Sequence, residues 1–159
     1  MQIFHLDTSV LIEREIRKKW LTKASVREGR VKLKVSQFAL SELFTLLKGK
    51  RKHDDVMNGI NDLIEGCKNG TLDVFVLKKE HWDVFTGYIR DLWKDVDHLG
   101  LVDLLIVASA FSDPECICLL TIDGKMLNSK VIKDVRDKVN IERRDSRLPD
   151  IRLRDASED

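Results

Sequence analysis

Hydrophobic and polar positions along this chain predict strands that alternate with helices. Short apolar runs and alternating apolar positions predict five strands, at residues 3–6, 31–35, 72–77, 116–120 and, as a last edge strand, 139–141. Apolar residues spaced three or four apart predict helices between them, starting near residues 10, 37, 56, 82, 101 and 125. Because strands that alternate with helices form parallel sheets, the pattern predicts one α/β domain with helices on both sides of a central sheet.

Two of the predicted helices have apolar patterns that indicate how they pack. In the helix over residues 82–96, apolar residues form a narrow seam that indicates a core contact or a dimer contact, and Trp93 and Tyr88 lie beside it. The helix over residues 101–111 is apolar nearly all round, which predicts that it is buried. Asp103 in its first turn is therefore an unusual acid, although the helix dipole also favours an acid at that position.

The C-terminal residues differ in composition from the rest of the chain. Residues 143–159 alternate Arg and Asp and contain few apolar anchors, which predicts a weakly ordered segment. The length of 159 residues and the 43% hydrophobic content suit a single domain with a sizeable core. The sequence therefore predicts a folded domain over residues 1–142 and an Arg/Asp-rich tail over residues 143–159.

Charge restricts where a nucleic acid could bind. The chain has 28 Lys and Arg against 27 Asp and Glu, a formal net charge of +1, so its overall charge indicates no polyanionic partner. One connection between helices is densely basic. Its residues Lys48, Lys50, Arg51 and Lys52 form either a solvated loop or a local surface that binds the RNA backbone.

Cysteines and apolar runs exclude several classes of protein. Cys67, Cys116 and Cys118 have no paired Cys-x-x-Cys spacing, which argues against a disulfide framework and against a structural zinc site. The longest apolar runs are far shorter than the roughly 18 residues that a membrane span needs. No signal-peptide pattern is present at the N-terminus. These features predict a cytoplasmic protein that does not contact a membrane.

Four acidic residues stand at positions where sites form in α/β proteins. Asp7 and Asp123 follow predicted strands, and Glu42 and Asp103 lie on predicted helices. Each acid has an ordinary explanation, because Asp caps helices and Glu is common on helix surfaces. In a three-layer α/β domain, however, the carboxyl ends of the strands meet at one edge of the sheet, so the four acids are expected to converge.

Converging carboxylates would require a cation. Like charges repel, and a buried cluster of acids without basic partners is stable only if a cation neutralises it. Oxygen ligands favour Mg²⁺ or Mn²⁺ over zinc. A metal held in this way is suited to activating water and to stabilising the charge that develops on a phosphoryl group during in-line attack.

Short motifs around these acids resemble those of a known family. Residues 6–11 (LDTSVL), 41–43 (SEL), 103–110 (DLLIVASA) and 120–123 (LTID) are similar, in the same order, to the four acidic motifs of PIN-domain nucleases. The chain length resembles that of single-domain VapC-type toxins. Gly124 and the Arg-rich tail match no part of the family pattern.

The resemblance implies a three-layer PIN-like domain and a Mg²⁺- or Mn²⁺-dependent ribonuclease. Such a protein is often a homodimer and often the toxin that a small antitoxin protein neutralises. The metal-binding acids would be Asp7, Glu42, Asp103 and Asp123. The hydroxyl groups that support them would belong to Thr8, Ser9 and Thr121.

Other functions remain open. A haloacid-dehalogenase phosphatase would need a second Asp two residues after Asp7, where this chain has Ser9. None of the eight glycines forms a phosphate-binding loop, which argues against a P-loop or dinucleotide enzyme. The remaining alternatives are a non-catalytic PIN-like module that binds RNA or protein, and a stand-alone RNA-processing nuclease.

Overall fold

The protein is built on a parallel sheet, seen in a computed structural model that describes residues 1–27, 29–49 and 53–158. Within these residues five strands pair in parallel, in the order β3-β2-β1-β4-β5. Their bounds are β1 Gln2–Leu6, β2 Val31–Ser36, β3 Leu72–Phe75, β4 Cys116–Thr121 and β5 Arg152–Asp155. The predicted α/β class with a central parallel sheet is confirmed.

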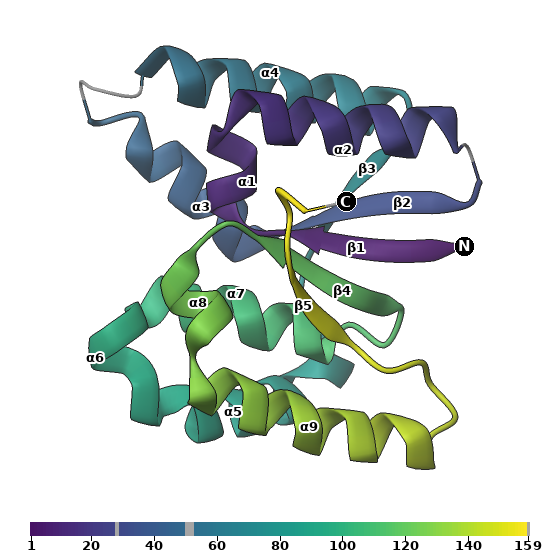
Figure 1. The fold of residues 1–159 in the computed structure, drawn as a ribbon, viewed down its shortest axis with the longest axis vertical. Helices are drawn as coiled ribbons and strands as arrows, with labels where there is room; N and C mark the ends of the chain where they lie inside the picture. Colours follow the sequence, from purple (N-terminus) through teal and green to yellow (C-terminus); the bar gives the residue numbers. More distant parts are fainter. Residues whose placement is uncertain (28, 50–52, 159) are drawn as a thin grey trace.

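Helices cover both faces of this sheet (Figure 1). On one face lie α2 (Arg14–Val26) and α4 (His53–Lys68), and on the other lie α5 (Trp82–Leu92), α7 (Leu101–Ser112) and α9 (Lys130–Asp145). The helices α1 (Thr8–Ile12), α3 (Gln37–Leu46), α6 (Val96–Leu99) and α8 (Gly124–Asn128) gather where the strands end. Two short 3₁₀ turns, Lys79–His81 and Trp93–Asp95, flank α5. Among the described helices, none is both long and apolar enough to cross a membrane.

The core lies between the central strands and the helices that cover them. Leu6, Leu33 and Leu120, on the three central strands, are fully buried. The predicted burial of α7 is confirmed from Leu104 onward, apart from the half-buried Leu105, whereas its first two residues are exposed. Lys34 on β2 is buried rather than solvated as an alternating pattern predicts, because its ammonium group binds the carboxylates of Asp113 and Glu115 beside the sheet.

The edge strand predicted at residues 139–141 is wrong, because these residues belong to α9. Ile132, Val135 and Val139 are spaced three and four residues apart, and all three are buried on the side of α9 that faces the sheet. A run of three residues was too short to distinguish a strand from the end of this amphipathic helix.

The weakly ordered tail predicted over residues 143–159 is also wrong. The strand β5 pairs with β4 as the fifth strand, and Ile151 and Ala156 on either side of it are fully buried. The side chain of Asn140 donates to the backbone oxygen of Ile151 and accepts from its backbone nitrogen, so it fixes the chain that leads into β5. The boundary expected after residue 142 therefore falls inside α9.

The helix predicted over residues 82–96 ends earlier than its pattern suggests. The α-helix stops at Leu92, and a 3₁₀ turn and α6 follow. Tyr88 is buried against Phe111 of α7, while Trp82 and Trp93 remain about half exposed. A surface that could receive a partner is therefore narrower than the sequence pattern suggests, and Tyr88 does not contribute to it.

Candidate active site

Two of the four acids begin helices directly after strands. Asp7 follows β1 and caps α1, where its carboxylate accepts from the backbone N–H of Ser9. Asp123 lies just beyond β4 and caps α8, where its carboxylate accepts from the backbone N–H of Lys125 at 2.9 Å. The capping role considered from the sequence is therefore present at both positions, and it holds both carboxylates at the same edge of the sheet.

The other two acids reach this edge from helices. Glu42 on α3 and Asp103 on α7 are both half-buried. The residue that caps α7 is Gly100, whose positive φ of 88° suits glycine, and no side chain caps this helix by a hydrogen bond. Since Asp103 makes no capping bond, only the helix dipole remains as a structural reason for an acid there.

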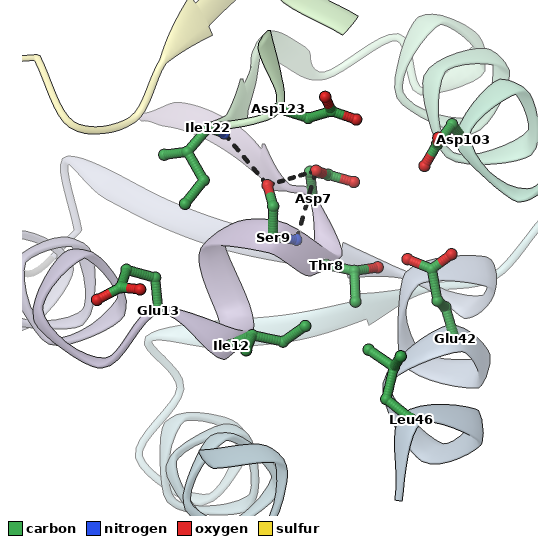
Figure 2. Close-up of a pocket in the computed structure, with 10 residues that line it drawn as sticks. All are labelled: Asp7, Thr8, Ser9, Ile12, Glu13, Glu42, Leu46, Asp103, Ile122 and Asp123. Carbon is green, nitrogen blue, oxygen red and sulfur yellow. Dashed lines mark hydrogen bonds between the residues drawn. The ribbon is translucent and has the colours of Figure 1, made fainter. Parts of the chain in front are cut away.

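The four carboxylates line one pocket of about 520 Å³. Figure 2 shows Asp7, Glu42, Asp103 and Asp123 directed into the same space from four different elements. The structure therefore brings together all four acids that the sequence singled out. The described residues that line this pocket include no Lys, Arg or His.

The sequence analysis missed one acid in this pocket. Glu13, at the break between α1 and α2, also lines it. Glu13 is the extended residue that ends α1 and precedes α2, and no glycine or proline marks this break in the sequence. Glu13 is exposed, so its charge is well solvated.

Two hydroxyl groups hold Asp7 in place. Its Oδ2 accepts from the Ser9 hydroxyl at 2.6 Å and from the Thr121 hydroxyl at 2.8 Å. Each hydroxyl also accepts from the chain after β4. Ser9 Oγ accepts from the backbone N–H of Ile122, and Thr121 Oγ1 accepts from the backbone N–H of Asp123. These bonds connect the ends of β1 and β4 and fix the two acids relative to each other.

Thr8 serves the site less directly. Its hydroxyl donates to the backbone oxygen of Ala39 on α3 at 3.4 Å, which links α1 to the helix that carries Glu42. The Thr8 hydroxyl also favours the ionised form of Glu42. Of the three hydroxyl residues expected to support the acids, Ser9 and Thr121 therefore contact Asp7, whereas Thr8 lies beside Glu42.

Among the described residues, none donates a hydrogen bond to the other oxygen of Asp7. Asp7 is only 2% exposed, and its Oδ1 is buried without a hydrogen bond. Burial raises the pKa of Asp7, although its bonds to Ser9 and Thr121 oppose this effect. Because an unpaired buried carboxylate oxygen is unfavourable, Asp7 Oδ1 is available to accept from a water molecule or to bind a cation.

Mutual repulsion acts on the other acids. Burial, together with the negative charges of Asp7, Glu42 and Asp123, raises the pKa of Asp103 to about 7, against the opposing effect of Lys125. Burial also raises the pKa of Glu42, with smaller contributions from Asp7 and Asp123. The pocket is therefore electrostatically strained when all of its acids are ionised.

The donor set fits a hard divalent cation. It consists of carboxylate oxygens, which suit Mg²⁺ or Mn²⁺, and it includes the unpartnered Asp7 Oδ1. Within the described ranges, no three His, Cys, Asp or Glu side chains are grouped closely enough to enclose a metal ion. Carboxylates that face one another across an open pocket repel, so this spacing is expected before a cation draws them together.

The basic stretch expected to bind RNA is described only in part. Lys48 is exposed just after α3, the helix that carries Glu42. Lys50, Arg51 and Lys52 lie outside the described residues. Binding of a phosphate backbone by this stretch therefore stays a prediction.

Removing the Thr121 hydroxyl is expected to impair the site without unfolding the protein. Thr121→Val keeps the shape of the side chain but loses the bond to Asp7 and the acceptor for the Asp123 backbone. Groups that orient metal ligands typically contribute about 10- to 100-fold to metal affinity. Isothermal titration with Mn²⁺ should show a loss in that range, whereas Thr86→Val on the exposed side of α5 should bind Mn²⁺ like wild type. Equal Mn²⁺ affinity for Thr121→Val and wild type would contradict this role.

Comparison with known proteins identifies the fold. No protein-family model matches the sequence, and no curated protein matches it either. Among solved structures, VapBC-1 from nontypeable Haemophilus influenzae matches with a TM-score of 0.62 and 19% identity, over 99% of this chain and 100% of that chain. VapBC2 from Rickettsia felis, bound to a DNA fragment from its promoter, matches with a TM-score of 0.59 and 16% identity, over 97% of this chain and 98% of that chain.

A third structure agrees. DNA-bound VapBC from Salmonella typhimurium matches with a TM-score of 0.53 and 19% identity, over 98% of this chain and 99% of that chain. At these identities the likeness concerns the fold, and it extends over nearly the whole length of each chain, including the residues that the sequence analysis expected to form a tail. The resemblance found in the four motifs is thereby confirmed at the level of structure: this chain has the PIN-like α/β fold of VapBC toxin–antitoxin structures.

Proposed function

We propose that this protein is a Mg²⁺- or Mn²⁺-dependent endoribonuclease. The observation that carries the proposal is the pocket in which four carboxylates from four elements face one another around a buried, unpartnered Asp7 oxygen. The PIN-like fold supports it, since a nuclease is the activity that this fold suggests. Asp7, Glu42, Asp103 and Asp123 would hold the metal.

The chain's own residues prepare this pocket for a metal and a phosphodiester. Ser9 and Thr121 orient Asp7 so that its free oxygen remains available. Asp103 holds a proton up to about pH 7 and would release it when a cation binds. The described lining offers no basic side chain to an anionic substrate, so charge neutralisation falls to the cation. A bound Mg²⁺ or Mn²⁺ would lower the pKa of a water molecule and stabilise charge on the phosphoryl oxygens.

We further propose that the nuclease is the toxin of a toxin–antitoxin pair. Three solved structures with this fold are VapBC structures, and two of them are bound to DNA. This chain would correspondingly bind a small antitoxin protein. Trp93, 52% exposed, and Trp82 offer apolar contacts for a partner or for a second copy in a homodimer. A stand-alone RNA-processing nuclease would have the same pocket but no antitoxin.

Cleavage of a labelled single-stranded RNA tests the proposed activity. Wild type should cut it with Mn²⁺ or Mg²⁺ and not with excess EDTA. Asp7→Asn should lose at least about 10³-fold in rate, because it removes a charged ligand whose interaction with the metal is strongest in the transition state. Asp134→Asn on the exposed side of α9 is the matched control and should cut like wild type.

One result would favour the non-catalytic alternative. If wild type and Asp7→Asn bind RNA equally well and neither cuts it with any divalent metal, the protein is a binding module. Rapid cleavage by wild type in EDTA would instead show that the activity does not depend on a divalent metal, which would contradict the proposed mechanism.

A further inference from the structure

A hollow opens on the sheet beside α2, away from the carboxylate pocket. The ring of Phe4 on β1 packs against Trp20 of α2 at 5.5 Å, so Phe4 points to the face that α2 covers. Beyond Phe4, a hollow of about 280 Å³ extends over β4 and β5. Cys118 and Phe4 contribute its apolar surface, and Arg152, Arg154, Gln2 and Asp150 contribute polar groups. This hollow is not part of the pocket that the four acids line.

Two arginines on the edge strand point to this hollow. In the parallel pairing, Arg152 lies opposite Cys118 and Arg154 lies opposite Leu120. Residues two positions apart on a strand point to the same face, and their Cα atoms are about 6.6 Å apart. Successive phosphates on an extended nucleic-acid strand have a comparable spacing. The two guanidinium groups therefore form a short row along β5.

Within the described part of the chain neither arginine is held by a direct ion pair, although the charge of Arg152 acts on Asp150, which lines the same hollow. Among the described residues, no side-chain hydrogen bond or ion pair within 4 Å involves the guanidinium group of Arg152, which is exposed, or of Arg154, which is half-buried. The neighbouring acid Asp150 is already bound by Arg144, whose Nε donates to it at 2.9 Å. Other arginines that are buried in the described ranges have partners for their side chains: Arg17 pairs with Asp62, and Arg143 donates to backbone oxygens.

Both positive charges act on the same buried atom. Burial raises the pKa of the Cys118 thiol to about 12, while Arg154 and Arg152 oppose this increase. Two like charges therefore lie close together at this hollow, and its acidic residue Asp150 is already bound by Arg144. An Arg side chain binds phosphate oxygens through two parallel N–H bonds, so a phosphate would compensate both charges.

The row leads toward the acids. Arg154 lies opposite Leu120, and the next residue of β4 is Thr121, whose hydroxyl holds Asp7. A chain bound along Arg152 and Arg154 would therefore reach the end of β4, where Asp123 follows. This approach runs along the opposite edge of the sheet from β3 and does not involve the basic stretch after α3.

We propose that Arg152 and Arg154 form a phosphate-binding surface, the β5 surface, that holds the backbone of single-stranded RNA on its way to the carboxylate pocket. The identity of the ligand as RNA rests on the proposed nuclease function. The β5 surface itself rests on the unpaired arginines, their common face and the hollow. It recognises the phosphodiester backbone and not the bases, so it binds without sequence preference.

Salt-dependent binding tests the β5 surface. Fluorescence anisotropy of a labelled single-stranded RNA is measured in EDTA between 50 and 200 mM salt, for the full chain and for Arg152→Gln/Arg154→Gln. We expect about 10- to 100-fold weaker binding at 50 mM salt, and a slope of log K against log salt that is lower by about 1.4, because each phosphate contact on a single strand contributes about 0.7.

The control pair removes the same charge elsewhere. Arg90→Gln/Lys133→Gln lies on α5 and α9, on the opposite side of the sheet, and should bind within about twofold of wild type. Arg152→Lys/Arg154→Lys retains both charges and should keep the wild-type slope, so it gives a result even if the Gln pair does not fold. Single-stranded DNA should show the same losses as RNA, because both present the same phosphates.

Several results would overturn the β5 surface. One is an unchanged salt slope for the Gln pair, and another is an equal loss of RNA binding for the control pair. A third is that the Gln pair loses binding to an acidic peptide but retains RNA binding, which would assign the arginines to a protein partner. Cleavage by wild type with Mn²⁺ is recorded separately. If the Gln pair binds RNA more weakly as expected, but neither wild type nor any variant cuts RNA, the nuclease proposal fails and the β5 surface stands.

Discussion

Asp103→Asn is expected to abolish Mn²⁺-dependent RNA cleavage while raising the melting temperature of the metal-free protein. Above neutral pH the Asp103 carboxylate is ionised at a cost in stability, since burial and three neighbouring acids raise its pKa to about 7. Asn keeps the shape and removes the charge. After allowance for solvent screening in an open pocket, the gain should be about 1 to 2 kcal/mol, or roughly 3 to 6 °C in a domain of this size.

The gain should depend on pH in a defined direction. In the unfolded chain Asp103 titrates near its ordinary pKa of 3.8, and in the folded chain near 7. Between these values the folded state binds more protons, so the wild type loses stability as the pH rises from about 4 to 7. The advantage of Asp103→Asn should therefore be full at pH 8 and shrink toward pH 4. Thermal melts in EDTA at pH 4.5, 6 and 8 measure it.

A first-turn acid outside the pocket provides the control for this prediction. Asp83 is exposed in the first turn of α5, so Asp83→Asn loses only its interaction with the helix dipole and should lower stability by less than about 1 kcal/mol. Added Mn²⁺ should stabilise wild type and Asp83→Asn much more than Asp103→Asn. A destabilised Asp103→Asn together with a wild type that is indifferent to Mn²⁺ would contradict the metal site.

Arg143→Met is expected to be the most destabilising of the substitutions considered. Arg143 is 4% exposed, and its guanidinium donates to the backbone oxygens of Pro149 at 2.7 Å, Cys116 at 2.5 Å, Pro114 and Asp113. It thereby joins α9, the start of β4 and the chain that leads to β5. Met fills similar space but leaves buried carbonyl oxygens without donors, at a cost of about 3 to 5 kcal/mol.

Urea unfolding measures this loss, and the adjacent residue supplies the control. Arg144 is exposed and pairs with Asp150 at the surface, so Arg144→Met should unfold at nearly the same urea concentration as wild type. If the two Met variants unfold at the same urea concentration, Arg143 does not join these elements as its hydrogen bonds indicate. An intact β5 is needed for the β5 surface as well, so Arg143→Met should also weaken RNA binding.

The positions of the site acids could be predicted from the sequence because Asp7 and Asp123 stand where a strand ends and a helix begins. An apolar run followed by Asp-Thr-Ser or Thr-Ile-Asp places an acid at the carboxyl end of a strand, whatever the packing around it. The order of the four short motifs then suggested that Glu42 and Asp103 face the same place, which the common pocket bears out. The supporting bonds were less accessible, since only the pairing of β1 with β4 brings Ser9 and Thr121 onto one oxygen of Asp7.

The C-terminal residues show where sequence patterns stop being informative. A period of alternating Arg and Asp indicates solvent exposure only if the charges have no buried partners. Here Arg143 satisfies four backbone carbonyls, and β5 adds to the sheet mainly through backbone pairing, which leaves little hydrophobic pattern in its own sequence. Glu13 was missed for a related reason, because the break between α1 and α2 that exposes it to the pocket has no glycine or proline to mark it.

Local sequence thus determined which residues form most of the strands and helices, because apolar periodicity and capping residues act over a few positions. It also determined that acids would collect at one edge of the sheet, because parallel strands end together. Tertiary structure alone decided the fifth strand, the burial of Lys34 with its partners Asp113 and Glu115, and the unpaired row of Arg152 and Arg154. These features depend on contacts between residues far apart in the chain. The local sequence around a charged residue does not show whether the fold will bring a partner to it.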